Sequence, residues 1–124
     1  MANPNIVAVT AIYGTTTYNT PSTTSATVLL SNAASSGLVY KINQIVAANV
    51  DGTNAVDTTV AINSAAAGAG TSYPIVSTVS VPADASLICV DKTTAIYLME
   101  NQSIVVTSGT ASKIAYTISY ENIS

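Results

Sequence analysis

Six acidic residues are the main source of metal-binding or catalytic chemistry in this 124-residue chain, which contains no His and no Arg. Asp51 and Asp57 enclose the segment DGTNAVD, whose carboxylate spacing resembles part of a calcium-binding loop. A Gly at the second position and the lack of a terminal Glu break the EF-hand pattern. We therefore expect an Asp-Gly turn that leads into a strand, and no metal site.

Carboxylates could also catalyse glycoside hydrolysis, because two carboxyl groups held about 5 to 10 Å apart can act as acid and base or nucleophile. A hydrolase that uses Asp51, Asp57 or Asp91 as its acid therefore stays an alternative, and a close carboxylate pair in a concave pocket would support it. The chain has no Trp and no Arg to hold a sugar. We expect a non-enzymatic protein with no catalytic residue and no cofactor.

Cys89 is the only cysteine, so the chain has no internal disulfide and no cysteine-rich metal site. Leu87, Ile88 and Val90 surround it, and the chain lacks the His that a catalytic thiol would need. We expect Cys89 to pack as a small apolar residue. The glycine-containing stretch SAAAGAGTSYP lacks the Lys of a phosphate-binding loop.

The charge of the chain is low and slightly acidic, with three basic residues and a formal net charge of -3. No basic patch is present to neutralise nucleic-acid phosphates, so nucleic acid is not expected as a partner. No apolar run approaches the roughly 20 residues that cross a bilayer, and the first residues do not resemble a signal peptide. We expect no membrane association, and synthesis in the cytoplasm.

Apolar and polar residues alternate along much of the chain, which is the period of a β-strand. The clearest case is 113–120, where Ile114, Tyr116, Ile118 and Tyr120 form one face. Further strands are expected at 6–13, 26–30, 38–48 and 56–63. Within 38–48 the apolar phase changes after Ile42, as the extra residue of a β-bulge would cause.

Stretches rich in turn-forming residues separate these runs, at 32–37, 51–54, 65–72, 82–86, 100–103 and 108–112. The Thr- and Ser-rich stretch 14–27 is expected to be a flexible linker or an extended loop that carries irregular strand, and the small-residue stretch 64–74 is expected to be a loop. Ile88 and Ile104 are expected in the core. The rhythm predicts an all-β fold: one antiparallel β-sandwich domain over residues 1–124, jelly-roll-like, with about eight or nine strands.

Tyrosine is abundant, with seven residues, and combines apolar area with a hydroxyl group, as protein interfaces favour. Tyr116 and Tyr120 fall on the apolar face of the last strand and are expected in the core. Tyr18 and Tyr73 lie within polar stretches, so we expect them to anchor an interface.

Four stretches, in order, carry a resemblance that covers nearly the whole chain: MANPNIVAVTAIYG, ANVDGTNAVDTTVAIN, STVSVPADASLICVDKTTAIYLMENQSIVVTSG and ISYENIS. Together they resemble the small virion structural proteins of marine tailed phages, especially cyanophages. The resemblance implies a β-sandwich component of the particle, with a capsid decoration or cement protein on the outer shell as the favoured role. It supplies no catalytic residues.

A cement protein adds contacts across the seams between capsomers, so the expected partners are the major capsid protein or other virion subunits. A homo-oligomer is expected because several weak contacts then act together, and the resemblance implies a trimer. The ends of the chain are expected to be contact segments because termini are seldom ordered unless they are tied down. These interface candidates are Ala2, Asn3, Pro4, Asn5, Ile6, Glu121, Asn122, Ile123 and Ser124.

Two other roles stay open for a β-sandwich with exposed tyrosines. One is a structural part of the tail, neck or fibre, and the other is an adhesive module that binds glycans. Many copies per particle would place the chain on the shell, and few copies would place it in the tail or neck. Binding to a glycan array would identify the adhesive module.

Overall fold

The computed structural model describes residues 4–124 and contains nine β-strands over that range. A single turn of 3-10 helix, η1 (Lys92–Thr94), separates β6 from β7. The strands are β1 (Ile12–Asn19), β2 (Thr27–Asn32), β3 (Val39–Asn49), β4 (Val56–Asn63), β5 (Ser72–Val81), β6 (Ser86–Val90), β7 (Ile96–Leu98), β8 (Gln102–Ser108) and β9 (Ile114–Ile123).

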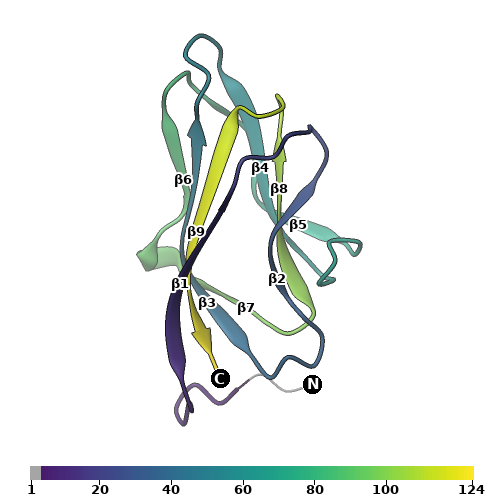
Figure 1. Cartoon of the computed structure of the whole chain (residues 1–124), viewed down its shortest axis with the longest axis vertical. Coiled ribbons are helices and arrows are strands. Elements are labelled where there is room, and N and C mark those ends of the chain that lie inside the picture. The colour runs from purple at the N-terminus through teal and green to yellow at the C-terminus, as the bar shows by residue number, and fades with distance from the viewer. Residues whose placement is uncertain (1–3) are drawn as a thin grey trace.

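The strands form two antiparallel sheets that face each other (Figure 1). The first sheet has the order β1-β9-β3-β6, and β7 pairs with β3 beyond the end of β6. The second sheet has the order β2-β8-β4-β5. The prediction of an all-β sandwich with eight or nine strands is confirmed.

The strand order is that of a jelly roll. β1 pairs with β9, β2 with β8, β3 with β6 and β7, and β4 with β5, so the chain is one long hairpin whose tip lies at 64–71. Successive pairs of this hairpin alternate between the sheets, which rolls the hairpin into two layers. The C-terminus and the first described residues therefore lie together at one end of the sandwich, the lower end in Figure 1.

The core lies between the sheets and is built from alternate residues of each strand. On β9, Ile114, Tyr116 and Ile118 are fully buried and Tyr120 is nearly so, as the sequence predicted. Ile104 of β8 is also fully buried. The Tyr116 hydroxyl donates to the Thr107 carbonyl at 2.9 Å and also bonds the Thr58 hydroxyl, so its polar end is satisfied inside the core.

The expected bulge in the third strand is present. The register between β3 and β9 shifts between Ile42 and Gln44, which leaves Asn43 as the extra residue. Ile42 and Ile45 therefore both point into the core although an odd number of positions separates them.

Three buried asparagines end strands β2, β3 and β4 and hold the turns that follow. Asn32 donates to the carbonyls of Leu38 and Leu98 at 2.9 and 3.1 Å, and Asn49 donates to those of Asn54 and Val81 at 3.0 and 2.9 Å.

Asn63 holds the hairpin tip in the same way. Its Nδ2 donates to the Gly70 carbonyl at 3.2 Å, and its Oδ1 accepts from the backbone N–H groups of Ala65 and Gly70 at 3.0 and 2.9 Å. Each of these side-chain amides bonds to backbone groups that the turn would otherwise leave unpaired. The three asparagines are therefore buried without loss of hydrogen bonds.

The N-terminal strand differs from the expectation. A strand was expected at 6–13 and a linker or an extended loop with irregular strand at 14–27, whereas the regular strand β1 occupies Ile12–Asn19 and residues 6–11 form turns and irregular backbone. β1 lies at the edge of its sheet and is exposed along almost its whole length, so it shows no apolar alternation. Its Thr and Tyr residues still favour extended backbone.

Of three further expectations on β5 and β6, two need correction and one agrees with the structure. Tyr73 lies on β5 and not in a loop. Ile88 lies opposite Val46 on the outer face of the first sheet and is 58% exposed, so its expected place in the core is wrong. Cys89 is half-buried and packs against the core, which agrees with its expected role as an apolar residue.

Candidate interaction surfaces

The carboxylate that suggested a calcium loop instead closes a turn. Asp51 Oδ1 accepts hydrogen bonds from the backbone N–H groups of Thr53 and Asn54 at 2.9 and 3.1 Å. These bonds, led by the one from Thr53, hold the pKa of Asp51 below its usual value. The geometry is that of an Asp-Gly turn between β3 and β4, as expected.

Asp91 has a comparable structural task at the start of η1. Its Oδ1 accepts from the Thr93 hydroxyl and from the Thr93 backbone N–H, the latter at 2.9 Å. These bonds lower the pKa of Asp91, the hydroxyl bond most of all. Among residues 4–124, no group of three or more His, Cys, Asp or Glu side chains comes together in a way that would hold a metal ion.

The thiol of Cys89 is held in its protonated form. Burial raises its pKa to about 11, so the nucleophilic thiolate is scarce at neutral pH. A weak contact joins its Sγ to the Leu87 carbonyl at 3.9 Å, and a backbone hydrogen bond with Ala47 offsets only part of the rise.

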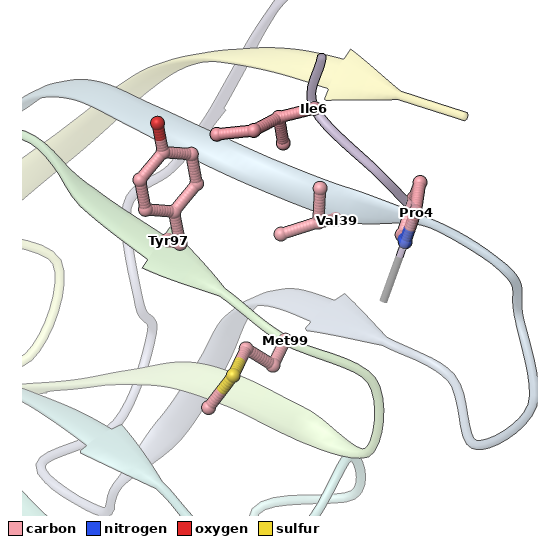
Figure 2. A pocket seen from close by; sticks show the side chains of 5 residues that line it. All are labelled: Pro4, Ile6, Val39, Tyr97 and Met99. Carbon is pink, nitrogen blue, oxygen red and sulfur yellow. The ribbon is translucent and has the colours of Figure 1, made fainter. Parts of the chain in front are cut away.

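An apolar cavity of about 290 Å³ opens at the lower end of the first sheet. Pro4 and Ile6 of the N-terminal segment, Val39 at the start of β3, Tyr97 of β7 and Met99 line it, and we call this site the apolar corner. Figure 2 shows that these side chains come from separate segments and surround one space. Because Ile6, Tyr97 and Met99 are also exposed to solvent, the apolar corner suits binding through apolar contact.

Backbone hydrogen bonds bring the two ends of the chain together beside this corner. The backbone N–H of Thr10 donates to the Ser124 carbonyl at 2.6 Å, and that of Ser124 donates to the Ala11 carbonyl at 3.0 Å. These bonds join residues 10 and 11, which follow the first of the two expected contact segments, to Ser124 of the second. Ala2 and Asn3, which belong to the first of them, lie outside the described residues.

Within these segments the residues differ in accessibility. Asn5 and Ile6 are exposed and Pro4 is partly exposed, so this segment can contact a partner. Ile123 is buried opposite Ile12 and Val39, while Asn122 and Ser124 are partly buried. Glu121, half-exposed, forms an ion pair with Lys41 at 3.8 Å.

The two expected aromatic anchors are exposed but lie on different edges. Tyr18 on β1 is 77% exposed, and Tyr73 on β5 is 62% exposed. β1 is an edge strand of the first sheet, whereas β5 is the edge of the second sheet that lies farthest from β2. The structure does not bring these two tyrosines into one surface.

Two neighbouring edge strands contain no charged residue, a feature that the sequence reasoning missed; the nearest charge is Glu121 of β9, which lies opposite Gly14 and pairs with Lys41. β1 and β2 are edge strands of the two sheets, and they are in contact. Both lie within residues 4–40, and the first charged residue of the chain is Lys41. We call β1 and β2 together the uncharged side; the signal for it is the charge-free run at the start of the sequence.

No protein-family model matches the chain, and no curated protein matches its sequence. None of the helical structure in residues 4–124 is long and apolar enough to cross a membrane. The fold therefore defines the class of protein here, a single jelly-roll β-sandwich, and its surface features are the basis for a functional proposal.

Proposed function

We propose that the chain is a non-enzymatic structural protein of a phage virion, a decoration or cement protein that binds the outer shell of the capsid. The phage assignment is supported by the resemblance of four successive stretches of the sequence. The apolar corner is the observation that carries the binding role, because five residues of separate segments form one open apolar site there. Such a site fits an apolar side chain of a neighbouring protein.

The physical requirement of this role is added contact area across the seams between capsomers. Small hydroxyl and amide side chains suit it because they lose little rotamer entropy when they are ordered and still form hydrogen bonds. β1 has this composition, with three threonines and an asparagine among eight residues. A surface with few charges also makes binding weakly dependent on salt.

The partners in this proposal are the major capsid protein and further copies of the chain. Linked copies that bind equivalent shell sites make each later contact intramolecular, so weak single contacts hold the assembly. The trimer implied by the resemblance stays a prediction. The expected location is the surface of the virion.

Binding to capsids that lack the chain tests this role. Purified protein added to such shells should bind in a saturable way and raise the temperature at which they open, measured by light scattering and by release of packaged DNA. Ile6→Ser and Met99→Ser, in the apolar corner, should each weaken binding about ten-fold, as loss of an anchor in a binding pocket does.

Val79→Ser is the matched control, because Val79 is an exposed apolar residue on β5 and lies outside the corner. It should leave shell binding unchanged. Shells that neither bind the protein nor gain resistance to heat would refute the cement role.

A tail, neck or adhesive role is the second candidate, and the exposed rings of Tyr18 and Tyr73 are the observation in its favour. Aromatic rings on a β-sandwich can stack on sugars. Specific binding to a glycan array that is lost in Tyr18→Ala or Tyr73→Ala would favour this role over the cement role.

A further inference from the structure

β1 is an open sheet edge. It pairs with β9 on one side over all eight of its residues, without a register shift, and it is the last strand of its sheet on the other side. An edge strand directs the N–H and C=O groups of alternate residues away from the sheet, where they are a template for another strand. All residues of β1 except Thr17 are exposed, so no part of the described chain covers this edge.

The other edge strands carry features that hinder such pairing. β5 contains Pro74, has two register shifts against β4, and has Thr78 at a φ of 49°. The remaining edge of the first sheet is interrupted between β6 and β7 by η1, with Asp91 and Lys92. Proline, bulges and charges are the usual ways in which proteins block edge pairing.

The fourth edge, β2, is less regular than β1. It is shorter, at six residues, and its pairing with β8 shifts between Val28 and Leu30. The Ser31 hydroxyl on this strand donates to the Ala66 carbonyl of the hairpin tip at 2.7 Å. β1 is thus the one edge of the described sandwich that is long, regular and uncharged.

Charge indicates what covers this edge. Each copy of the chain has a net charge of -3, so two copies repel each other at most orientations. The uncharged side is where they approach with the least repulsion, because Glu121 of β9, opposite Gly14, is paired with Lys41. Its β1 strand, Ile-Tyr-Gly-Thr-Thr-Thr-Tyr-Asn, has an apolar or aromatic residue near each end and threonines in the middle, a pattern that complements itself when it is reversed.

We propose that β1 pairs antiparallel with β1 of a second copy, so that the two first sheets become one continuous sheet across a two-fold axis. Centring the axis on Thr15 places Ile12 opposite the second copy's Tyr18 at both ends of the pair. Both residues are on the outer face of the sheet. They lie opposite Ile123 and Thr117, which are odd-numbered residues of β9, whereas the core residues of β9 between 114 and 120 are even-numbered. Cross-strand apolar pairs of this kind stabilise sheets.

Sedimentation analysis of the purified full chain over a range of concentrations tests the proposal first. A reversible monomer–dimer equilibrium is expected. Thr16→Lys places like charges close together across the axis and should weaken the dimer at least about ten-fold. Ser77→Lys adds the same charge to the exposed edge β5 and should leave the dimer unchanged.

Cysteine cross-linking tests the register, in a background in which Cys89→Ala removes the native thiol. Paired residues in an antiparallel sheet have Cα atoms roughly 4.5–5.5 Å apart, within disulfide range. Thr15→Cys, on the axis, should therefore form an intermolecular disulfide under mild oxidation. Thr17→Cys, on the same face but opposite the second copy's Tyr13, should not.

Monomers at every concentration, or association that Thr16→Lys leaves unchanged, would overturn the proposal, as would cross-linking by Thr17→Cys and not by Thr15→Cys. A trimer that persists in Thr16→Lys would overturn it and would favour the symmetry implied by the resemblance. The inference gives the proposed homo-oligomer a two-fold interface and a dimer, in place of the trimer that the resemblance implies. Its failure is distinguishable from failure of the virion role because self-association and shell binding are measured separately.

Discussion

The sandwich has two lateral sides, each formed by one edge strand from each sheet. These sides differ in how far their strand edges are protected from pairing with another strand. On one side β1 and β2 present uncharged backbone, and β1 is regular from Ile12 to Asn19. On the other side β5 and β6 are in contact, and Pro74, register shifts and the charged turn η1 disrupt their edges. A jelly roll needs neither arrangement for its core, so the difference points to the surface and its partners.

The comparison teaches that edge protection is selective in this molecule. A protein that had only to avoid aggregation would block all four edges. Leaving β1 open is understandable if a strand of a partner covers it, which is the role that we infer for a second copy. The predictions below separate the core, which both sides share, from features that belong to one side.

The largest effect is expected where a change reaches the shared core. Ile104 is fully buried, so Ile104→Asp places an unpaired charge there and should cost more than about 4 kcal/mol, enough to unfold the domain. Ile88→Asp, on the exposed face of β6, should cost less than about 1 kcal/mol. Circular dichroism during thermal unfolding measures both, and equal losses would contradict the assignment of Ile88 to the outer face.

Asparagines at strand ends give the next largest contrast. Asn63→Ala removes the buried amide that holds the hairpin tip and leaves partly buried backbone groups without their partners, so the free energy of unfolding should fall by about 2 kcal/mol. Asn19 is likewise the last residue of its strand, β1, but it is exposed. Asn19→Ala should therefore change the free energy of unfolding by less than about 0.5 kcal/mol. Urea unfolding tests the pair, and a similar loss in both would show that the side-chain bonds of Asn63 contribute little.

A threonine-to-glycine substitution should change the free energy of unfolding in opposite directions on edge strands β5 and β1. Thr78 on β5 has a φ of 49°, which strains a β-branched residue, so Thr78→Gly should raise the free energy of unfolding by about 0.5–1 kcal/mol. On regular β1, Thr15→Gly should lower it by about 1 kcal/mol. Unfolding of dilute protein in urea is the measurement. Destabilisation by Thr78→Gly would mean that β5 is not strained there.

The smallest effect concerns acid stability on the β6 side. The pKa of Asp91 is lowered in the folded state, so this carboxylate stabilises the fold above its unfolded pKa of about 4 and loses that contribution as the pH falls through its folded pKa. Melting temperatures between pH 5 and pH 2 should therefore fall slightly less for Asp91→Asn than for the unchanged chain. Parallel curves would show that the η1 cap does not affect stability.

Much of the fold was predictable because its strands alternate. The core face of β9, the bulge after Ile42 and the turns between strands follow from residue period and turn composition. β1 was misplaced because an edge strand exposed on both faces leaves no alternation to detect. Ile88 was assigned to the core because local sequence does not reveal which face of a short strand points inward when its register shifts between Ile45 and Val46.

The surfaces were less predictable than the core. Tyr18 and Tyr73 were expected to be exposed, and they are, but only the strand order shows that they lie on separate edges. The apolar corner joins Pro4 and Ile6 to Tyr97 and Met99, residues more than ninety positions apart, so no local pattern signals it. The uncharged side had a signal in the sequence, because charge-free residues precede Lys41, but its meaning required the pairing of β1.

The proposed virion role is tested most directly by the copy number of the chain in purified phage particles. Quantitative mass spectrometry against the major capsid protein is the measurement. The cement role predicts a fixed stoichiometric ratio to the capsid protein, with copies spread over the whole shell. Absence of the chain from washed particles would contradict a virion role, and only a few copies per particle would contradict a place on the shell.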